Sequence, residues 1–279
     1  MNEHANMLLL SEIFPPKTGG SGRWFFELYR RLPKGQAVLA VGEDPRQDEF
    51  DAACDLPIVR LPLAMPAWGM ANWRGLRDYL RRARTIRRLL REHGITRIHC
   101  GRTLPEGWIA WMLRKLCGTR YLSYVHGEEL NLGVQSREFG WMQRRVLAGA
   151  DALIANSRNT ARLLADRWDV PAERIRVLHP GVDVARFAPA PPCLDARREL
   201  QWHDRPVVLT VGRLQKRKGH DQLIRALPAV LGGVPEALYA IVGDGEERAA
   251  LERQVAEAGI QRHVRFHGEL DDAALVRCY

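Results

Sequence analysis

The stretch Val207–Lys218, VVLTVGRLQKRK, determines the fold expected for this chain. Its first five residues are mostly β-branched, which is typical of a strand. Gly212 follows, and a helical apolar pattern begins near His220. Four cations lie between them: Arg213, Lys216, Arg217 and Lys218. A strand that enters a helix through a basic loop brings backbone N–H groups, a helix N-terminus and cationic side chains together, which suits a diphosphate. An ordinary basic surface loop has the same composition.

Short apolar strands alternate with helical patterns along the rest of the chain, which predicts an α/β fold with mostly parallel sheets. The expected strands are 7–10, 36–41, 57–61, 96–100, 120–125, 151–155, 174–178, 207–211, 238–242 and 263–267. The segment 42–55 is polar and is expected to be a loop. A proline-rich stretch, Ala-Pro-Ala-Pro-Pro-Cys at 188–193, predicts a stiff linker. We therefore expect domains at 1–187 and 206–279, joined by a linker at 188–205.

Composition narrows the class of protein. The 279 residues are 46% hydrophobic and 27% charged, and no apolar run approaches the roughly 20 residues that span a bilayer. The N-terminus lacks the basic region of a signal peptide. Five scattered cysteines without a Cys-x-x-Cys motif indicate a reduced, cytoplasmic location and no zinc site. Residues 1–190 hold 29 Lys and Arg against 20 Asp and Glu, whereas residues 191–279 hold 13 of each. The excess of positive charge therefore favours an anionic partner for the first part of the chain.

Residues 71–93 form the clearest predicted helix. An apolar face follows Leu76, Leu80, Ala83 and Leu90, while arginines crowd another face over Arg74–Arg91. Such a helix either packs on the core and leaves its basic face in solvent, or lies peripherally on the anionic inner face of the cell membrane. Nucleic-acid binding is not expected, because no recognised module is present and aromatic residues do not interleave with the cations.

Two loops of the first part carry further candidate binding residues. Gly19, Gly20 and Gly22 lie between an expected strand and helix, where glycine permits positive φ and close approach to a ligand, and Ser21 is a candidate helix cap. His126-Gly-Glu-Glu follows the strand 120–125, at the end of a parallel strand where ligands bind. There His126 would donate to a substrate hydroxyl or phosphate, oriented by either of the two glutamates. A plain strand-to-helix turn and a capping histidine are the structural alternatives.

In the second part, Gly243-Asp244-Gly245 follows the strand 238–242 and by itself is a weak indication of nucleotide binding. No Asp-x-Asp stands at a strand end. The adjacent Asp271-Asp272 is typical of a helix start. We therefore expect neither a metal nor a cofactor, and fixed cations with a helix N-terminus would stabilise a departing diphosphate instead.

Together these stretches resemble the retaining glycosyltransferases of family 4, which have the GT-B fold of two Rossmann-like domains. The matching residues are Phe14-Pro-Pro with Gly19-Gly20, His126-Gly127-Glu128, Pro180-Gly181-Val182-Asp183 with Phe187, Val211-Gly212-Arg213-Leu214 with Lys218-Gly219, Val242-Gly243-Asp244-Gly245, and Val264-Arg-Phe-His-Gly. Their order covers nearly the whole chain.

The resemblance implies a metal-independent transfer of sugar, with retention, from a nucleotide-diphosphate sugar to a lipid or glycan acceptor in envelope or polysaccharide synthesis. Arg213 and Lys218 would bind the donor diphosphate and His126 the donor sugar, and these three are the expected catalytic residues. The donor-binding set implied is Gly19, Gly20, Gly212, Arg213, Lys218, Gly243 and Asp244.

The chain departs from the family in one respect. The family's Glu-x₇-Glu motif has no counterpart before Tyr279, and only three strands are expected in the second part. The expectation is therefore a glycosyltransferase truncated within an incomplete donor domain. A nucleotide-sugar epimerase, a phosphorylase and an inactive fragment remain as alternatives.

Overall fold

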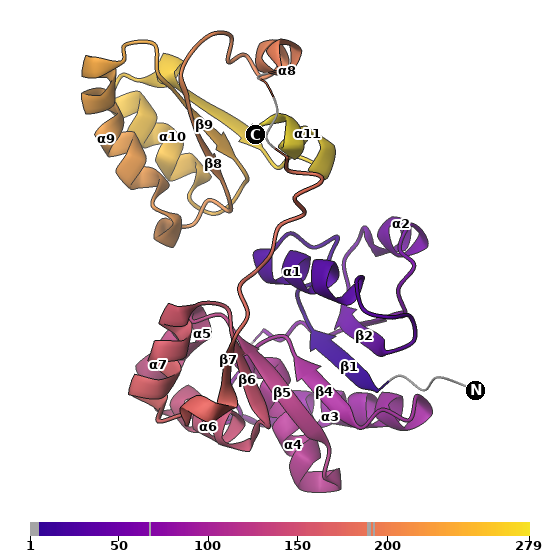
Figure 1. Ribbon diagram of the computed structural model, residues 1–279. Coiled ribbons are helices and arrows are strands. Elements are labelled where there is room, and N and C mark those ends of the chain that lie inside the picture. Colours follow the sequence, from indigo (N-terminus) through magenta and orange to yellow (C-terminus); the bar gives the residue numbers. More distant parts are fainter. Residues whose placement is uncertain (1–5, 67, 189–190, 192) are drawn as a thin grey trace. The chain divides into compact units, whose positions relative to one another are not determined.

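The computed structural model describes residues 6–66, 68–188, 191 and 193–279. The chain divides into two compact units, Met1–Gly181 and Val182–Tyr279 (Figure 1). Within the stretch predicted as linker, a short helix, α8 (Leu194–Glu199), is present, while residues 189, 190 and 192 lie outside the described residues.

The first unit is built on a seven-stranded sheet in the order β3-β2-β1-β4-β5-β6-β7, and every neighbouring pair is parallel. The strands are β1 (Met7–Ser11), β2 (Ala37–Gly42), β3 (Ile58–Leu61), β4 (Arg97–Cys100), β5 (Arg120–Val125), β6 (Ala152–Ala155) and β7 (Ile175–Val177). The chain adds β2 and then β3 on one side of β1, and it then crosses back to add β4 on the other side of β1. Loops that leave β1 and β4 at their carboxyl ends therefore diverge, and this opening is where sheets of this kind bind ligands.

Helices cover both faces of this sheet because side chains alternate along each strand. Leu8 and Leu10 pack in one cluster with Tyr79 and Trp108, whereas Leu9 packs in another with Phe25. The helices are α1 (Gly20–Tyr29), α2 (Gln47–Ala52), α3 (Trp73–Glu92), a π-helical turn (Thr103–Gly107), α4 (Trp108–Cys117), α5 (Glu128–Gln135), α6 (Arg137–Gly149), α7 (Arg158–Trp168) and a 3₁₀ turn (Ala172–Arg174).

The second unit has a three-stranded parallel sheet in the order β10-β9-β8. Its elements after α8 are β8 (Val207–Val211), a 3₁₀ turn (Lys216–Lys218), α9 (His220–Gly233), β9 (Leu238–Val242), α10 (Arg248–Glu257), a 3₁₀ turn (Gln261–His263), β10 (Val264–Gly268) and α11 (Asp272–Arg277). Asp271 caps α11 by accepting a hydrogen bond from Ala274 N, as its sequence predicts. The α/β class and the parallel sheets predicted from the sequence are thus confirmed.

Two local predictions are wrong. The expected loop 42–55 contains α2, which has no buried residue and packs only through Phe50, so it has no helical apolar period to detect. Ser21 does not cap α1. Gly19 is the N-cap residue, and no side chain caps that helix.

Helix α3 confirms the predicted amphipathic helix, with a shifted buried face. Tyr79, Ala83 and Ile86 are buried, whereas Leu76 and Leu80 are only half-buried. Arg82 does not belong to the exposed arginine face, because it is 6% exposed and its Nη2 donates to Ala64 O at 2.7 Å. The exposed arginines are Arg74, Arg77, Arg81, Arg84, Arg88 and Arg91. Among the described residues, no helix has the length and apolar content needed to cross a membrane.

Candidate active site

The candidate residues of the first unit lie around the carboxyl ends of β1, β4 and β5. Gly19 and Gly20 begin α1 after the loop that leaves β1. The predicted positive φ is wrong, since Gly19 has φ of 170° and Gly20 and Gly22 are helical. A Cβ at Gly22 would instead lie 3.0 Å from Phe14 Cα, so packing against the loop requires this glycine. Without a side-chain cap, the first N–H groups of α1 remain available to an anion.

His126 follows β5 and is held from three directions. Its Nε2 lies 2.8 Å from Gly101 O, its backbone N–H donates to Glu129 Oε1 at 2.9 Å, and its carbonyl accepts from Asn156 Nδ2 at 3.2 Å. A carbonyl oxygen only accepts, so Nε2 carries the hydrogen and Nδ1 of the neutral ring is an acceptor. The ring also packs edge-on against Trp24 of α1, with centroids 5.9 Å apart. The imidazole is therefore fixed beside α1, and of the two expected glutamates Glu129 does orient its backbone.

An ion network beside this site was not predicted from the sequence. Arg102 Nε donates to Glu106 at 3.1 Å, and its Nη2 pairs with Glu12, which also pairs with Lys17. Glu106 in addition accepts a hydrogen bond from Glu12 N at 2.9 Å. Arg102 lies 5.1 Å over the ring of Trp68. Glu12 directly follows β1 and Arg102 closely follows β4, so their position at the ends of adjacent strands was the available signal.

This network fixes the charge of its members. Burial alone would raise the pKa of Glu12, but hydrogen bonds and positive charge from Lys17 and Arg102 lower that pKa overall. Burial opposes the charge on Arg102, yet Glu106 and Glu12 raise the pKa of its guanidinium. Glu12 is therefore a carboxylate near neutral pH and accepts hydrogen bonds rather than donating them.

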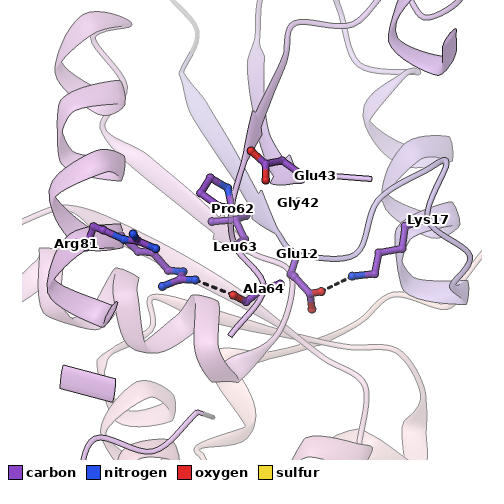
Figure 2. A pocket seen from close by; sticks show the side chains of 9 residues that line it. Glu12, Lys17, Gly42, Glu43, Pro62, Leu63, Ala64 and Arg81 are labelled. Atoms are coloured by element: carbon purple, nitrogen blue, oxygen red, sulfur yellow. Dashed lines mark hydrogen bonds and ion pairs between the residues drawn. The ribbon is translucent and has the colours of Figure 1, made fainter. Parts of the chain in front are cut away.

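A cavity of about 230 Å³ opens next to Glu12. Figure 2 shows the side chains that line it, with Lys17 directed at Glu12. The lining residues come from the ends of β1, β2 and β3 and from α3: Glu12, Lys17, Gly42, Glu43, Pro62, Leu63, Ala64, Arg81 and Arg82. Within the described part of the chain, the side chains of Glu43 and Arg81 have no hydrogen-bonding or ionic partner. A carboxylate and a guanidinium without a partner among the described residues thus line this cavity.

A second group of candidate residues lies in the basic loop after β8, in the second unit. Lys216 Nζ lies 2.8 Å from Asp221 Oδ2, and this contact lowers the pKa of Asp221. Lys216 is therefore already paired with a carboxylate at the start of α9. The exposed side chains of Arg213 and Lys218 have no such partner among the described residues. Of the cations in VGRLQKRK, these two are the ones predicted to bind a diphosphate.

The loop Gly243-Asp244-Gly245 lies directly against the basic loop. Leu214 N donates to Asp244 O at 2.9 Å, and a Cβ at Gly243 would lie 2.2 Å from Gly212 O. The structure thus brings Gly212, Arg213, Lys218, Gly243 and Asp244 together in the second unit. In the first unit, the ring of His126 packs against Trp24 of α1, the helix that begins after Gly19. Across the described residues, no group of three or more His, Cys, Asp or Glu side chains is arranged to hold a metal ion.

Two parallel α/β units, each with polar loops at the carboxyl ends of its strands, are the architecture of the GT-B class of fold. The family described as Glycosyltransferase Family 4 matches residues 18–186, and Glycosyl transferases group 1 matches residues 195–279. The chain belongs to glycosyltransferase family 4.

Named relatives agree with this family. Over 278 residues the chain is 30% identical to the GDP-mannose-dependent alpha-(1-6)-phosphatidylinositol monomannoside mannosyltransferase of Mycolicibacterium smegmatis, covering 93% of this chain and 66% of that protein. Over 182 residues it is 35% identical to the D-inositol 3-phosphate glycosyltransferase of Salinispora tropica, covering 57% and 37% respectively. The chain therefore spans about two thirds of the length of the first relative.

Solved structures share the fold. The Anabaena protein HepE in complex with UDP and glucose superposes with a TM-score of 0.79 at 18% identity, over 97% of this chain and 71% of that one. WaaG, a glycosyltransferase involved in lipopolysaccharide biosynthesis, superposes with a TM-score of 0.65 at 17% identity, over 96% and 71%.

Proposed function

We propose that this protein transfers a sugar from a nucleotide-diphosphate sugar to an acceptor, without a metal ion and with retention of anomeric configuration. The observation that carries the proposal is the pair of cations Arg213 and Lys218, between the end of β8 and the start of α9, which have no ionic partner among the residues that the structure describes. Membership of family 4 supports the reaction class. The family's expected stereochemistry is the reason for proposing retention.

The proposed chemistry is electrostatic. When the glycosidic bond to the donor breaks, negative charge develops on the leaving diphosphate. Arg213 and Lys218, with the N–H groups at the start of α9, would stabilise that charge in place of a metal ion. Lys216 contributes less, because Asp221 already neutralises it.

The remaining donor contacts are proposed from the loops described above. The uncapped start of α1, at Gly19 and Gly20, would approach the donor phosphates through backbone N–H groups. His126 would accept a hydrogen bond from a donor-sugar hydroxyl at Nδ1, since its Nε2–H is already used by Gly101 O. This differs from the donating role that its sequence position suggested. Gly212, Gly243 and Asp244 complete the proposed donor set.

We propose that the acceptor binds in the cavity beside Glu12. Carboxylates such as Glu12 and Glu43 suit the hydroxyl groups of a sugar or polyol, and Arg81 suits an anionic group. The M. smegmatis relative is named for a phosphatidylinositol mannoside acceptor, which combines these features. A lipid-linked or glycan acceptor is therefore the class to test first.

Peripheral contact of α3 with anionic membrane is a second proposal, supported by its row of exposed arginines and by Trp73, which is 72% exposed at its first turn. Each cation near such a surface contributes about 1 kcal/mol. Sedimentation with phosphatidylglycerol vesicles should fall as salt is raised, and replacing Arg77 and Arg84 by Gln should weaken it. Absence of binding at low salt would contradict membrane contact and leave the solvated-face alternative.

A donor panel tests the main proposal. The chain is incubated with GDP-mannose, UDP-glucose and related donors, with and without a phosphoinositol or glycolipid acceptor, and released nucleoside diphosphate is measured. Release should persist in EDTA, and NMR of the product should show the donor's anomeric configuration. Conversion of the donor to an epimer without release would favour an epimerase. If the chain releases no nucleoside diphosphate and binds neither UDP nor GDP, the proposed donor site is wrong.

A further inference from the structure

His220, the first residue of α9, links three elements behind the basic loop. Its side chain is buried, with 2% of the residue exposed. Its Nδ1 lies 3.1 Å from the Tyr239 hydroxyl on β9, and its Nε2 lies 3.4 Å from Arg213 O. Because the carbonyl only accepts, Nε2 carries the hydrogen and the tyrosine hydroxyl donates to Nδ1 of the neutral ring. The imidazole therefore ties the backbone of the basic loop to the sheet.

The opposite side of the loop is held by backbone contacts. Leu214 N donates to Asp244 O at 2.9 Å, and Glu247 N donates to Leu214 O at 3.1 Å. A Cβ at Gly245 would lie 2.6 Å from Leu214 O, so these two segments touch with no room for side chains. Leu214 itself is fully buried in the core of the second unit. Arg213, which precedes Leu214, is thereby directed outward with its guanidinium in solvent.

The far end of the loop is anchored by α9. Lys216 pairs with Asp221, and the Asp221 carbonyl accepts from Gln254 Nε2 at 2.9 Å. The backbone that carries the two free cations is thus fixed on both sides, while their side chains stay available. Electrostatic stabilisation of a developing charge depends on such preorganisation, because reorganising the loop on binding would consume part of the interaction energy.

We propose that His220 is a positioning residue for the donor diphosphate. It acts through Arg213 by fixing the backbone from which that cation extends, and it does not itself touch the ligand. The Gly243–Gly245 segment holds the loop from the other side. This inference rests on the proposed function, since it assumes that the loop binds the diphosphate of a nucleotide.

The test measures UDP and GDP binding to the whole chain by calorimetry, together with thermal unfolding. His220→Leu removes both hydrogen bonds at similar volume, and we expect it to weaken nucleotide binding about tenfold. His220→Gln has an amide that can donate to Arg213 O, and we expect it to recover most of that loss. Tyr239→Phe removes only the hydroxyl donor and should weaken binding by a smaller factor. It serves as the second variant if His220→Leu fails to fold.

Val255→Ala is the matched structural control, because Val255 is 5% exposed in the same core but lies on α10 and makes no hydrogen bond to the loop through its side chain. It should lower the unfolding temperature without changing nucleotide affinity. Wild-type affinity in both His220→Leu and Tyr239→Phe would overturn the positioning role, as would an equal loss of affinity in Val255→Ala. If Arg213→Ala abolishes binding while the His220 variants bind normally, the donor site stands and only the positioning role fails. If the unaltered chain binds neither UDP nor GDP, the proposed function itself fails.

Discussion

Replacing Glu106 tests the ion network that holds the loops after β1 and β4. Its side chain is 2% exposed, accepts from Glu12 N at 2.9 Å, and faces Arg102 Nε at 3.1 Å. Glu106→Gln keeps the volume and one oxygen for the backbone N–H, but it loses the negative charge opposite Arg102 and the second oxygen that accepts from Arg102 Nε. Such a charge-assisted bond contributes roughly 1.5–3 kcal/mol, and Arg102 keeps Glu12 as a partner, so we expect a loss of about 2 kcal/mol.

Glu106→Ala should cost more than the glutamine variant. It also leaves the buried N–H of Glu12 without an acceptor, which adds roughly 1–3 kcal/mol. The combined loss is then about 3–5 kcal/mol, the range for breaking a buried pair by removing one partner.

Urea unfolding followed by tryptophan fluorescence measures both losses, because seven of the eight tryptophans lie in the first unit. The transition midpoint should fall at an unchanged slope. Glu92→Gln is the matched control, since Glu92 pairs with Arg88 on the exposed surface of α3 and its loss should leave the midpoint unchanged. Equal losses for the Gln and Ala variants, or a loss no greater than that of the control, would refute this account of the network.

Three further predictions concern residues in the two units of the chain. Lys218→Ala should lower turnover roughly 10²–10³-fold, whereas Lys216→Ala should lower it much less; equal effects in a nucleoside diphosphate release assay would argue against the assignment of the free cations. The pKa of Glu12 is lower in the folded than in the unfolded protein, so the stabilisation from its ionised form is present above pH 4.5 and is lost as pH falls through the folded pKa. Glu12→Gln should therefore flatten the decline of the urea midpoint over that acidic range. A profile of midpoint against pH that is unchanged in the variant would contradict this. Gly243→Ala should lower the unfolding temperature of the second unit, because its Cβ would lie 2.2 Å from Gly212 O. Gly232→Ala in α9 places its Cβ in open space and should be neutral or stabilising by about 0.5–1 kcal/mol. Calorimetric unfolding temperatures in the opposite order would refute the packing argument.

The apolar periodicity of the sequence and its turn and capping residues determined the class of fold. The strands β5, β8 and β9 and the capping residue Asp271 fall where the sequence predicts them. Local rules sufficed there because strands buried on both faces need apolar runs and helix starts need side-chain acceptors. The same rules missed α2, in which no residue is buried.

The sequence also predicted a basic loop at a strand end, but it could not say which of the cations are free. That depends on where Asp221 points, and only the packed start of α9 places its carboxylate beside Lys216. Which ring nitrogen of His126 donates was likewise decided by Gly101 O, the acceptor of a partner 25 residues away.

Contacts between distant residues were decided by the tertiary structure alone. Glu12 and Arg102 are 90 residues apart and meet because β1 and β4 are neighbours in the sheet. Arg82 is one of many arginines in its helix, yet it alone faces Ala64 and is buried. The sequence by itself therefore determined which elements form and which residue types line their ends, because these follow from local period and charge. Which of those side chains pair with one another, and which remain free to bind a ligand, was decided only when the parallel sheets brought separate strand ends together.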